Sequence, residues 1–112
     1  MRKDRIASVL IRAVSEIIEH KIKDPRLGLV TITTVDVSSD LKKAIVYFSS
    51  LNDKNEGLAT LNRAKGYIRT ELANRVRMRH IPDIEFKIDN SYEYGKKIDA
   101  LINQISKDNK DQ

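Results

Sequence analysis

Two runs rich in β-branched residues, joined by a short polar turn, constrain this chain more than any other feature. The first run spans residues 28–37 and the second spans residues 41–50, with a Ser-Ser-Asp turn between them. β-Branched side chains suit a pleated, half-buried surface, and so short a connection predicts an antiparallel hairpin. The apolar phase shifts between Ile32 and Val35, which predicts a β-bulge. The chain is therefore expected to contain a sheet.

Helical patterns flank this hairpin. Apolar residues recur at helical spacing from Ile6 to Ile18, and Asp24-Pro25 predicts the end of that helix, because a proline disfavours helix at the residue before it. After the hairpin, Asn52 or Asp53 is expected to cap a second helical segment, and Asp53 with Glu56 resembles a capping box. The apolar stripe of this segment continues to about residue 77. The triplet Ala64-Lys65-Gly66 interrupts this stripe. A glycine destabilises a helix interior, so we predict a kink here and two short helices.

A third strand and a last helix complete the pattern. Apolar and polar residues alternate over residues 84–89, and Ser91 is expected to cap a helix whose apolar positions end at Ile105. We therefore predict one α+β domain over residues 1–106 and a short polar tail over residues 107–112. The predicted order is α-β-β-α-α-β-α, with a three-stranded sheet packed by helices.

Composition excludes several classes of protein. The chain has 112 residues, no cysteine and a formal net charge of +5. The lack of cysteine excludes disulfide frameworks, thiol nucleophiles and cysteine-rich zinc sites. No apolar run approaches the roughly 20 residues of a membrane span, and no signal peptide is recognisable. We therefore expect a cytoplasmic protein that makes no contact with membranes.

The positive charge is concentrated in one stretch. Residues 63–80 hold six cations against the single acid Glu71, a balance of +5 that equals the net charge of the whole chain. Arginine suits bidentate contact with phosphate, so this stretch predicts polyanion binding, with a merely solvated basic surface as the alternative. Aromatic residues for base stacking are few, and contacts should favour phosphates. The candidate binding residues are Arg63, Lys65, Arg69, Arg75, Arg77 and Arg79.

Candidates for catalysis are few. The two histidines, His20 and His80, lie 60 positions apart and form no recognisable metal spacing. No nucleophile is placed beside a base, and Gly95-Lys96-Lys97 lacks the rest of a phosphate loop. We therefore expect no enzymatic activity, no metal, no cofactor and no small-molecule substrate.

The order of elements, taken with several short motifs, resembles the ribosome-binding factor A family of bacteria. The resemblance covers nearly the whole chain, and its motifs are jointly specific. The matching residues are Lys23-Asp24-Pro25-Arg26, Val30 to Val35, Ser39-Asp40-Leu41, Ala44 to Tyr47, Ala64-Lys65-Gly66, Arg77 to Pro82, and Ser91 with Gly95 to Ile98. It implies a KH-like fold of the second type, in which Ala64-Lys65-Gly66 takes the place of the Gly-x-x-Gly loop that clamps a nucleic-acid backbone.

The resemblance also implies a function. Members of this family are assembly factors that bind free small (30S) ribosomal subunits, assist late maturation of 16S rRNA and support growth in the cold. For this chain we expect a monomer that binds small-subunit RNA through the six cations, with Ala64 and Gly66 setting the angle between the two helices. The alternatives are a protein–protein adaptor, a generic KH-type RNA-binding module and, less favoured, an enzyme such as a nuclease.

Overall fold

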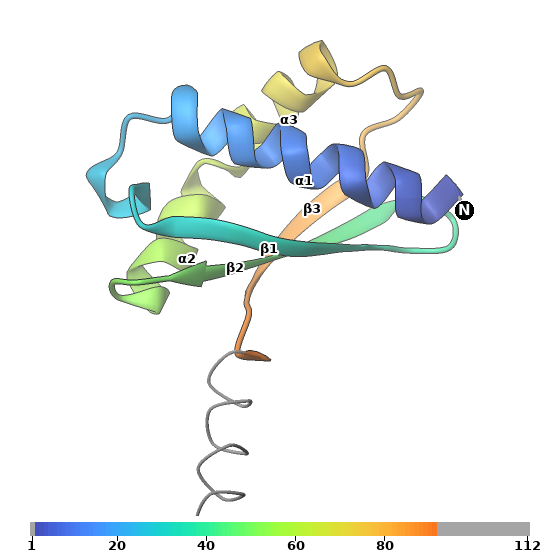
Figure 1. The fold of residues 1–112 in the computed structure, drawn as a ribbon. Helices are drawn as coiled ribbons and strands as arrows, with labels where there is room; N and C mark the ends of the chain where they lie inside the picture. Colours follow the sequence, from blue (N-terminus) through green and yellow to red (C-terminus); the bar gives the residue numbers. More distant parts are fainter. Residues whose placement is uncertain (1, 92–112) are drawn as a thin grey trace, which may run out of the picture.

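Three helices and a three-stranded sheet form the described part of the chain. The computed structural model describes residues 2–91. The helix predicted after Ser91 and the tail over residues 107–112 lie outside them. The elements are α1 (Arg2–His20), the 3-10 helix η1 (Pro25–Leu27), β1 (Val30–Val37), β2 (Lys43–Ser50), α2 (Lys54–Arg63), α3 (Lys65–Arg75) and β3 (Asp83–Ile88) (Figure 1). The predicted order α-β-β-α-α-β is confirmed over this range.

The hairpin is antiparallel, and the predicted bulge is present. Strands β1 and β2 pair from Val30 with Ser50 to Val37 with Ala44, and the register shifts between Ile32 and Thr34. The hydroxyl of the extra residue, Thr33, donates to the carboxylate of Asp89 at 2.5 Å. The bulge therefore joins β1 to the segment that leaves β3.

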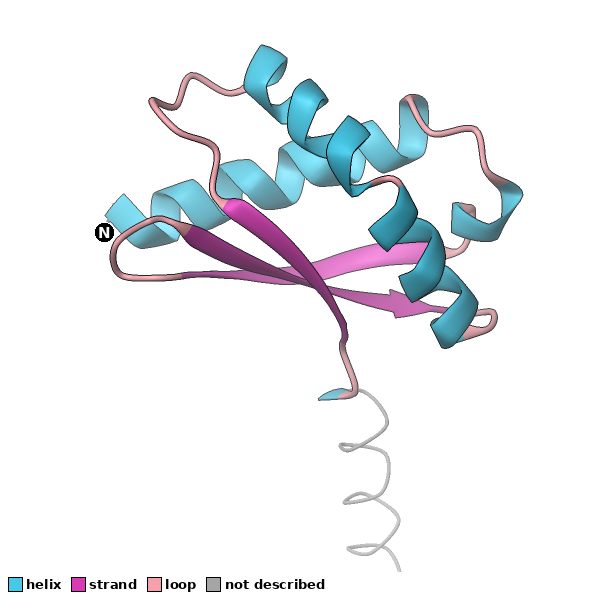
Figure 2. Ribbon diagram, turned by 180° about the vertical axis from the view of Figure 1, so that it is seen from behind, coloured by secondary structure: helices cyan, strands magenta, loops and turns pink. Residues whose placement is uncertain are grey.

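The third strand lies beside β2 and runs parallel to it, which gives the sheet order β1-β2-β3. A parallel neighbour requires a crossover connection, and α2 with α3 supplies it. Figure 2 shows this crossover from behind: α3 lies above the strands, and α2 lies in front of their ends. The sheet is thereby covered by helices on one face, and its other face carries polar residues such as Thr31, Glu85 and Lys87.

The core lies between the helices and one face of the sheet. Alternate strand residues, among them Val46, Phe48 and Phe86, are buried there against Leu10, Val14 and Ile17 of α1 and Leu61, Ile68 and Leu72 of the crossover helices. Helix α1 packs against β1 and α3, and α2 packs against β3 and η1. Burial of Ile68 and Leu72 holds α3 on the sheet, and this fixes the start of α3 and the loop after it relative to the strands.

Side-chain caps mark the starts of α2 and η1. The Asp53 carboxylate accepts hydrogen bonds from the backbone N–H groups of Asn55 and Glu56, at 2.9 and 3.2 Å, which confirms the predicted cap of α2. Asp24 caps η1, a short turn that sequence periodicity did not indicate. Because η1 occupies residues 25–27, β1 starts at Val30 and not at the predicted residue 28.

Candidate nucleic-acid interface

The six predicted binding cations fall into separate environments. Arg63 ends α2, Lys65 and Arg69 lie in the first half of α3, and Arg75 ends that helix. Arg77 and Arg79 lie in the loop between α3 and β3. Lys65 and Arg69 share one surface groove, and Arg77 and Arg79 share a second groove. Arg63 and Arg75 contact protein groups elsewhere.

The first groove, here called the kink groove, lies between the start of α3 and the sheet. Its charged lining consists of Lys43, Lys65, Arg69, Asp83 and Glu85. Three cations against two acids give it a formal charge of +1. Its floor is the beginning of the parallel ladder, where Lys43 pairs with Asp83 and Ile45 with Glu85. Lys43 also belongs to this site, although it lies outside residues 63–80 and is not among the predicted binding residues.

Arg69 and Lys65 differ in how far the protein engages them. The Nη2 atom of Arg69 lies 3.5 Å from Asp83 Oδ1 and donates to the carbonyl of Ile81 at 3.4 Å. Both partners are largely exposed, so this ion pair is weak and can yield to a phosphate. Lys65 forms no ion pair with any described side chain. Lys65 is therefore not paired with a described acid, and Arg69 is held only by a weak ion pair.

The kink itself falls at Ala64. This residue is both the C-cap of α2 and the N-cap of α3, with φ −85° and ψ −1°. Its N–H donates to Thr60 at 3.1 Å, and its carbonyl accepts from Ile68 at 2.9 Å. Gly66 follows within the first turn of α3, has no positive φ, and a Cβ added there would meet nothing within 4 Å. The angle between the helices therefore does not require a glycine at position 66.

The start of α3 is electrostatically suited to an anion. It has no side-chain cap and no acidic residue in its first turn, which carries Lys65 instead. The free backbone N–H groups and the helix dipole place partial positive charge at a helix N-terminus, where acidic residues or anions are usually found. Lys65 adds a full charge at the same place, and the bare backbone of Gly66 leaves room for close approach.

Arg75 has a structural role, because it pairs with Glu16 of α1. Its Nη1 lies 3.1 Å from Glu16 Oε2 of α1, its Nε lies 3.8 Å from Glu71 Oε2, and its side chain is only 28% exposed. It therefore ties the end of α3 to α1. Nothing in the local sequence indicated this partner, because Glu16 lies far away along the chain.

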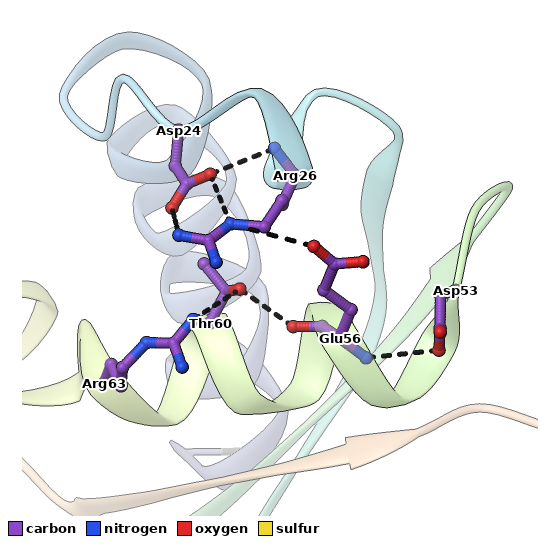
Figure 3. Close-up of polar contacts among 6 residues, drawn as sticks. All are labelled: Asp24, Arg26, Asp53, Glu56, Thr60 and Arg63. Carbon is purple, nitrogen blue, oxygen red and sulfur yellow. Dashed lines mark hydrogen bonds and ion pairs between the residues drawn. The ribbon is translucent and has the colours of Figure 1, made fainter.

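Arg63 belongs to a polar cluster that joins η1 to α2 (Figure 3). Its Nη2 donates to the buried hydroxyl of Thr60 at 3.2 Å, and that hydroxyl donates to the carbonyl of Glu56 at 2.8 Å. In the same cluster the Asp24 carboxylate accepts from the Arg26 backbone N–H, Nε and Nη2, at 3.0, 2.9 and 2.8 Å. These hydrogen bonds lower the pKa of Asp24 from 3.8 to about 2.

The Asp24 carboxylate provides a pH-dependent test of this cluster. Because its pKa is lower in the folded chain, its contribution to stability is present above about pH 4 and is lost as the pH falls through 2. The substitution Arg26→Gln is expected to raise the pKa of Asp24, since it removes the guanidinium hydrogen bonds. Carboxyl-carbon NMR titration measures this. Arg63→Gln is the control, with a smaller expected shift, and equal shifts in both variants would contradict the assignment.

The second groove, here called the loop groove, contains Arg77 and Arg79. Arg5 of α1 and Lys42 of the β1–β2 turn also line it, so four cations from three elements meet there. Arg5 and Lys42 were absent from the predicted site because they lie far from residues 63–80 in the sequence. Among residues 2–91, no group of three or more His, Asp or Glu side chains is arranged to hold a metal ion. No helix in that range is long and apolar enough to cross a membrane.

Comparison with known proteins identifies the relatives of this chain. Residues 2–102 match the family model for ribosome-binding factor A. The chain belongs to this family. Ribosome-binding factor A of Brevibacillus brevis is 44% identical to it over 118 aligned positions, which cover 100% of this chain and 98% of that protein.

Solved structures of the ribosome-binding factor A family share the fold. The crystal structure of the Thermus thermophilus member is 36% identical, with a TM-score of 0.73, and covers 77% of this chain and 94% of that one. A homology model of the Thermus thermophilus member, fitted into the cryo-electron-microscopy map of its 30S complex, is 36% identical with a TM-score of 0.66. The match covers 75% of this chain and 91% of that chain. The expected KH-like α+β fold is confirmed.

Proposed function

We propose that this chain binds the free small ribosomal subunit through 16S rRNA and assists late maturation of that RNA in the cytoplasm. The observation that carries the proposal is the family match over residues 2–102, together with a relative fitted into a 30S complex. The chain acts as a monomer and by binding alone, with no catalytic step of its own. Its contribution to growth in the cold follows from the same role in subunit assembly.

The kink groove is the proposed primary contact. Lys43 and Lys65 supply cations for phosphates, and Arg69 joins them when it exchanges Asp83 for a phosphate. The uncapped start of α3 supplies backbone N–H groups for a phosphate oxygen. Such contacts hold an RNA segment in one arrangement and read its backbone, since phosphate contacts carry no sequence information. Arg75 and Arg63 act through the protein itself, by holding α3 and α2 in place.

Co-sedimentation with purified ribosomal particles tests this function. The protein is expected to travel with free small subunits and to leave assembled ribosomes. If the three cations of the kink groove neutralise about three phosphates, log K should fall with log salt at a slope of about −2 or steeper. The alternatives give other results. A generic RNA binder would bind naked single strands as tightly as intact subunits, an adaptor would show a slope near zero, and a nuclease would turn over RNA in the presence of magnesium.

A further inference from the structure

The loop groove is a hollow at one end of the molecule, separate from the kink groove. The start of α1, the β1–β2 turn and the loop after α3 surround it, and all three lie at the same end of the fold in Figure 1. Its volume of about 880 Å³ is within the range of pockets that hold small organic groups. It is therefore large enough for a nucleobase with its sugar.

The cations on its rim form no close ion pairs in the described chain, although the charge of Lys42 acts on nearby Asp40. Arg5, Lys42, Arg77 and Arg79 form no side-chain hydrogen bond and no close ion pair with any residue from 2 to 91. By contrast, Arg26, Arg69 and Arg75 each lie within 4 Å of a carboxylate. Four cations against two acids, Asp40 and Asp83, give the lining of this groove a formal charge of +2, which favours an anionic ligand.

The two acids that border the groove are already engaged. Asp40 accepts a hydrogen bond from the Ser38 hydroxyl at 2.7 Å and from the Lys42 N–H at 3.0 Å, and these bonds keep its pKa below the usual range. Asp83 lies 3.5 Å from Arg69 Nη2, on the kink-groove side. Neither carboxylate forms a close ion pair with the cations of the rim, and two acids against four cations leave the groove with a net positive charge.

The lining between these cations is apolar. It is made by side chains that are half-buried and packed on the core, namely Ile6, Leu41, Met78 and Ile81. Leu41 adopts a left-handed backbone with φ 62°, unusual for a branched residue, and the Ser38–Asp40 hydrogen bonds of the turn hold it there. A cationic rim around an apolar floor complements a ligand that joins phosphate to a flat, weakly polar ring.

We propose that the loop groove holds one unpaired nucleotide of the bound RNA, with its base on the apolar floor and its flanking phosphates on Arg77 and Arg79, assisted by Arg5 and Lys42. An unpaired base exposes the ring faces that stacking in an RNA double helix would cover. The planar guanidinium group of arginine and apolar side chains can both pack on these faces. The inference rests on the proposed function, because it names the form of RNA that the same protein contacts.

The two grooves are neighbours, so one RNA strand passes through both. Asp83 borders each of them. Its charge would repel a phosphate crossing from one groove to the other, but the Arg69 guanidinium beside it offsets that charge. The strand therefore runs along the start of β3, with its phosphates on the kink groove at one end and an unpaired base in the loop groove at the other.

The first experiment measures fluorescence anisotropy of ten-nucleotide oligoadenylate with the double variant Arg77→Gln/Arg79→Gln. Affinity is expected to fall at least fivefold, and the salt slope to become less steep by about 1 to 2, since two phosphate contacts are lost. Arg12→Gln/Lys87→Gln is the matched control, with the same loss of charge on exposed residues away from both grooves, and should change affinity less than twofold. Equal affinity in the two double variants overturns the proposal.

The second experiment tests the base itself. In a series of these oligonucleotides, each lacks the base at a different single position. At one of these positions, loss of the base should weaken binding about fivefold or more. In the floor variant Met78→Ser this penalty should shrink, because the base has lost its contact. A penalty that is the same at every position, or unchanged in Met78→Ser, overturns the proposal. Far-ultraviolet circular dichroism checks folding, and Arg5→Gln/Lys42→Gln tests the same rim from two other elements.

The failure of this inference is distinguishable from the failure of the proposed function. If Lys65→Gln/Arg69→Gln weakens binding to small subunits while Arg77→Gln/Arg79→Gln does not, the function stands and the nucleotide pocket is wrong. If neither pair changes binding to small subunits, both are wrong.

Discussion

Charge reversal at Lys65 and Arg69 is expected to lower affinity for free small subunits by about a hundredfold. The double variant Lys65→Glu/Arg69→Glu changes the formal charge of the kink groove by four, from +1 to −3, counting Lys43, Asp83 and Glu85 as the other members. Two favourable phosphate contacts become two repulsions, and a hundredfold loss corresponds to about 2.8 kcal/mol of binding free energy. Co-sedimentation at fixed ionic strength measures it.

This reversal should leave the fold intact. Arg69 is exposed, and its only acidic partner among the described residues is the exposed Asp83, a kind of ion pair that contributes at most about 1 kcal/mol. A thermal melt therefore serves as the check on stability. Arg75 is unsuited to this experiment, because it bonds Glu16 across to α1 and its reversal would bring three carboxylates together.

The matched control for the reversal is Arg12→Glu/Lys87→Glu. It makes the same change in net charge on α1 and on the polar face of β3, and is expected to change affinity about twofold or less. If the control weakens binding as strongly as the groove variant, only the overall charge of the protein matters. If neither weakens it, phosphate contact in the kink groove is wrong, and the adaptor role becomes the better explanation.

Replacement of Gly66 by alanine is expected to separate stability from binding. A Cβ at this position meets nothing within 4 Å, and the residue is helical without a positive φ, so alanine should stabilise the fold by about 0.5 to 1 kcal/mol. The same methyl group blocks close approach of a phosphate to the backbone at the start of α3, and affinity for small subunits should fall about tenfold. Thermal unfolding and co-sedimentation measure the two effects.

Gly57 offers the control for this substitution. It is also helical, and an added Cβ would make ordinary contacts with Phe48 and Val30, at 3.5 and 3.6 Å. Gly57→Ala should therefore stabilise α2 by a similar amount and leave binding unchanged. An unchanged affinity in Gly66→Ala would show that the glycine is not kept for contact with RNA, and that the kink groove binds through its side chains alone.

Features set by neighbouring residues could be predicted from the sequence. The Asp53 cap, the bulge after Ile32 and the break at Ala64 each depend on a few adjacent residues, whose conformational preferences act locally. The hairpin could be predicted for the same reason, since its two strands are joined by a short turn. The family resemblance added the KH-like arrangement, which local patterns alone left open.

Features that join distant segments could not be predicted in this way. The parallel pairing of β2 with β3 depends on how the crossover helices pack, and the ion pair of Arg75 with Glu16 links residues from opposite halves of the described chain. The six cations followed from a local count of charge, whereas Lys43, Arg5 and Lys42 reach the grooves through tertiary structure. A charge count finds a basic segment but does not tell which of its members are already paired.

The parallel pairing of β2 with β3 links binding to folding. The floor of the kink groove is the first part of that ladder, which backbone bonds extend at both ends, from Asp83 to Lys42 at 2.8 Å and from Asp89 to Phe48 at 2.7 Å. A chain in which β3 has detached has no such floor, so RNA held there is a ligand of the native state alone. By mass action, a ligand present at 100 times its Kd stabilises that state by about 2.7 kcal/mol. The RNA whose arrangement this protein is proposed to stabilise would therefore also stabilise the folded protein.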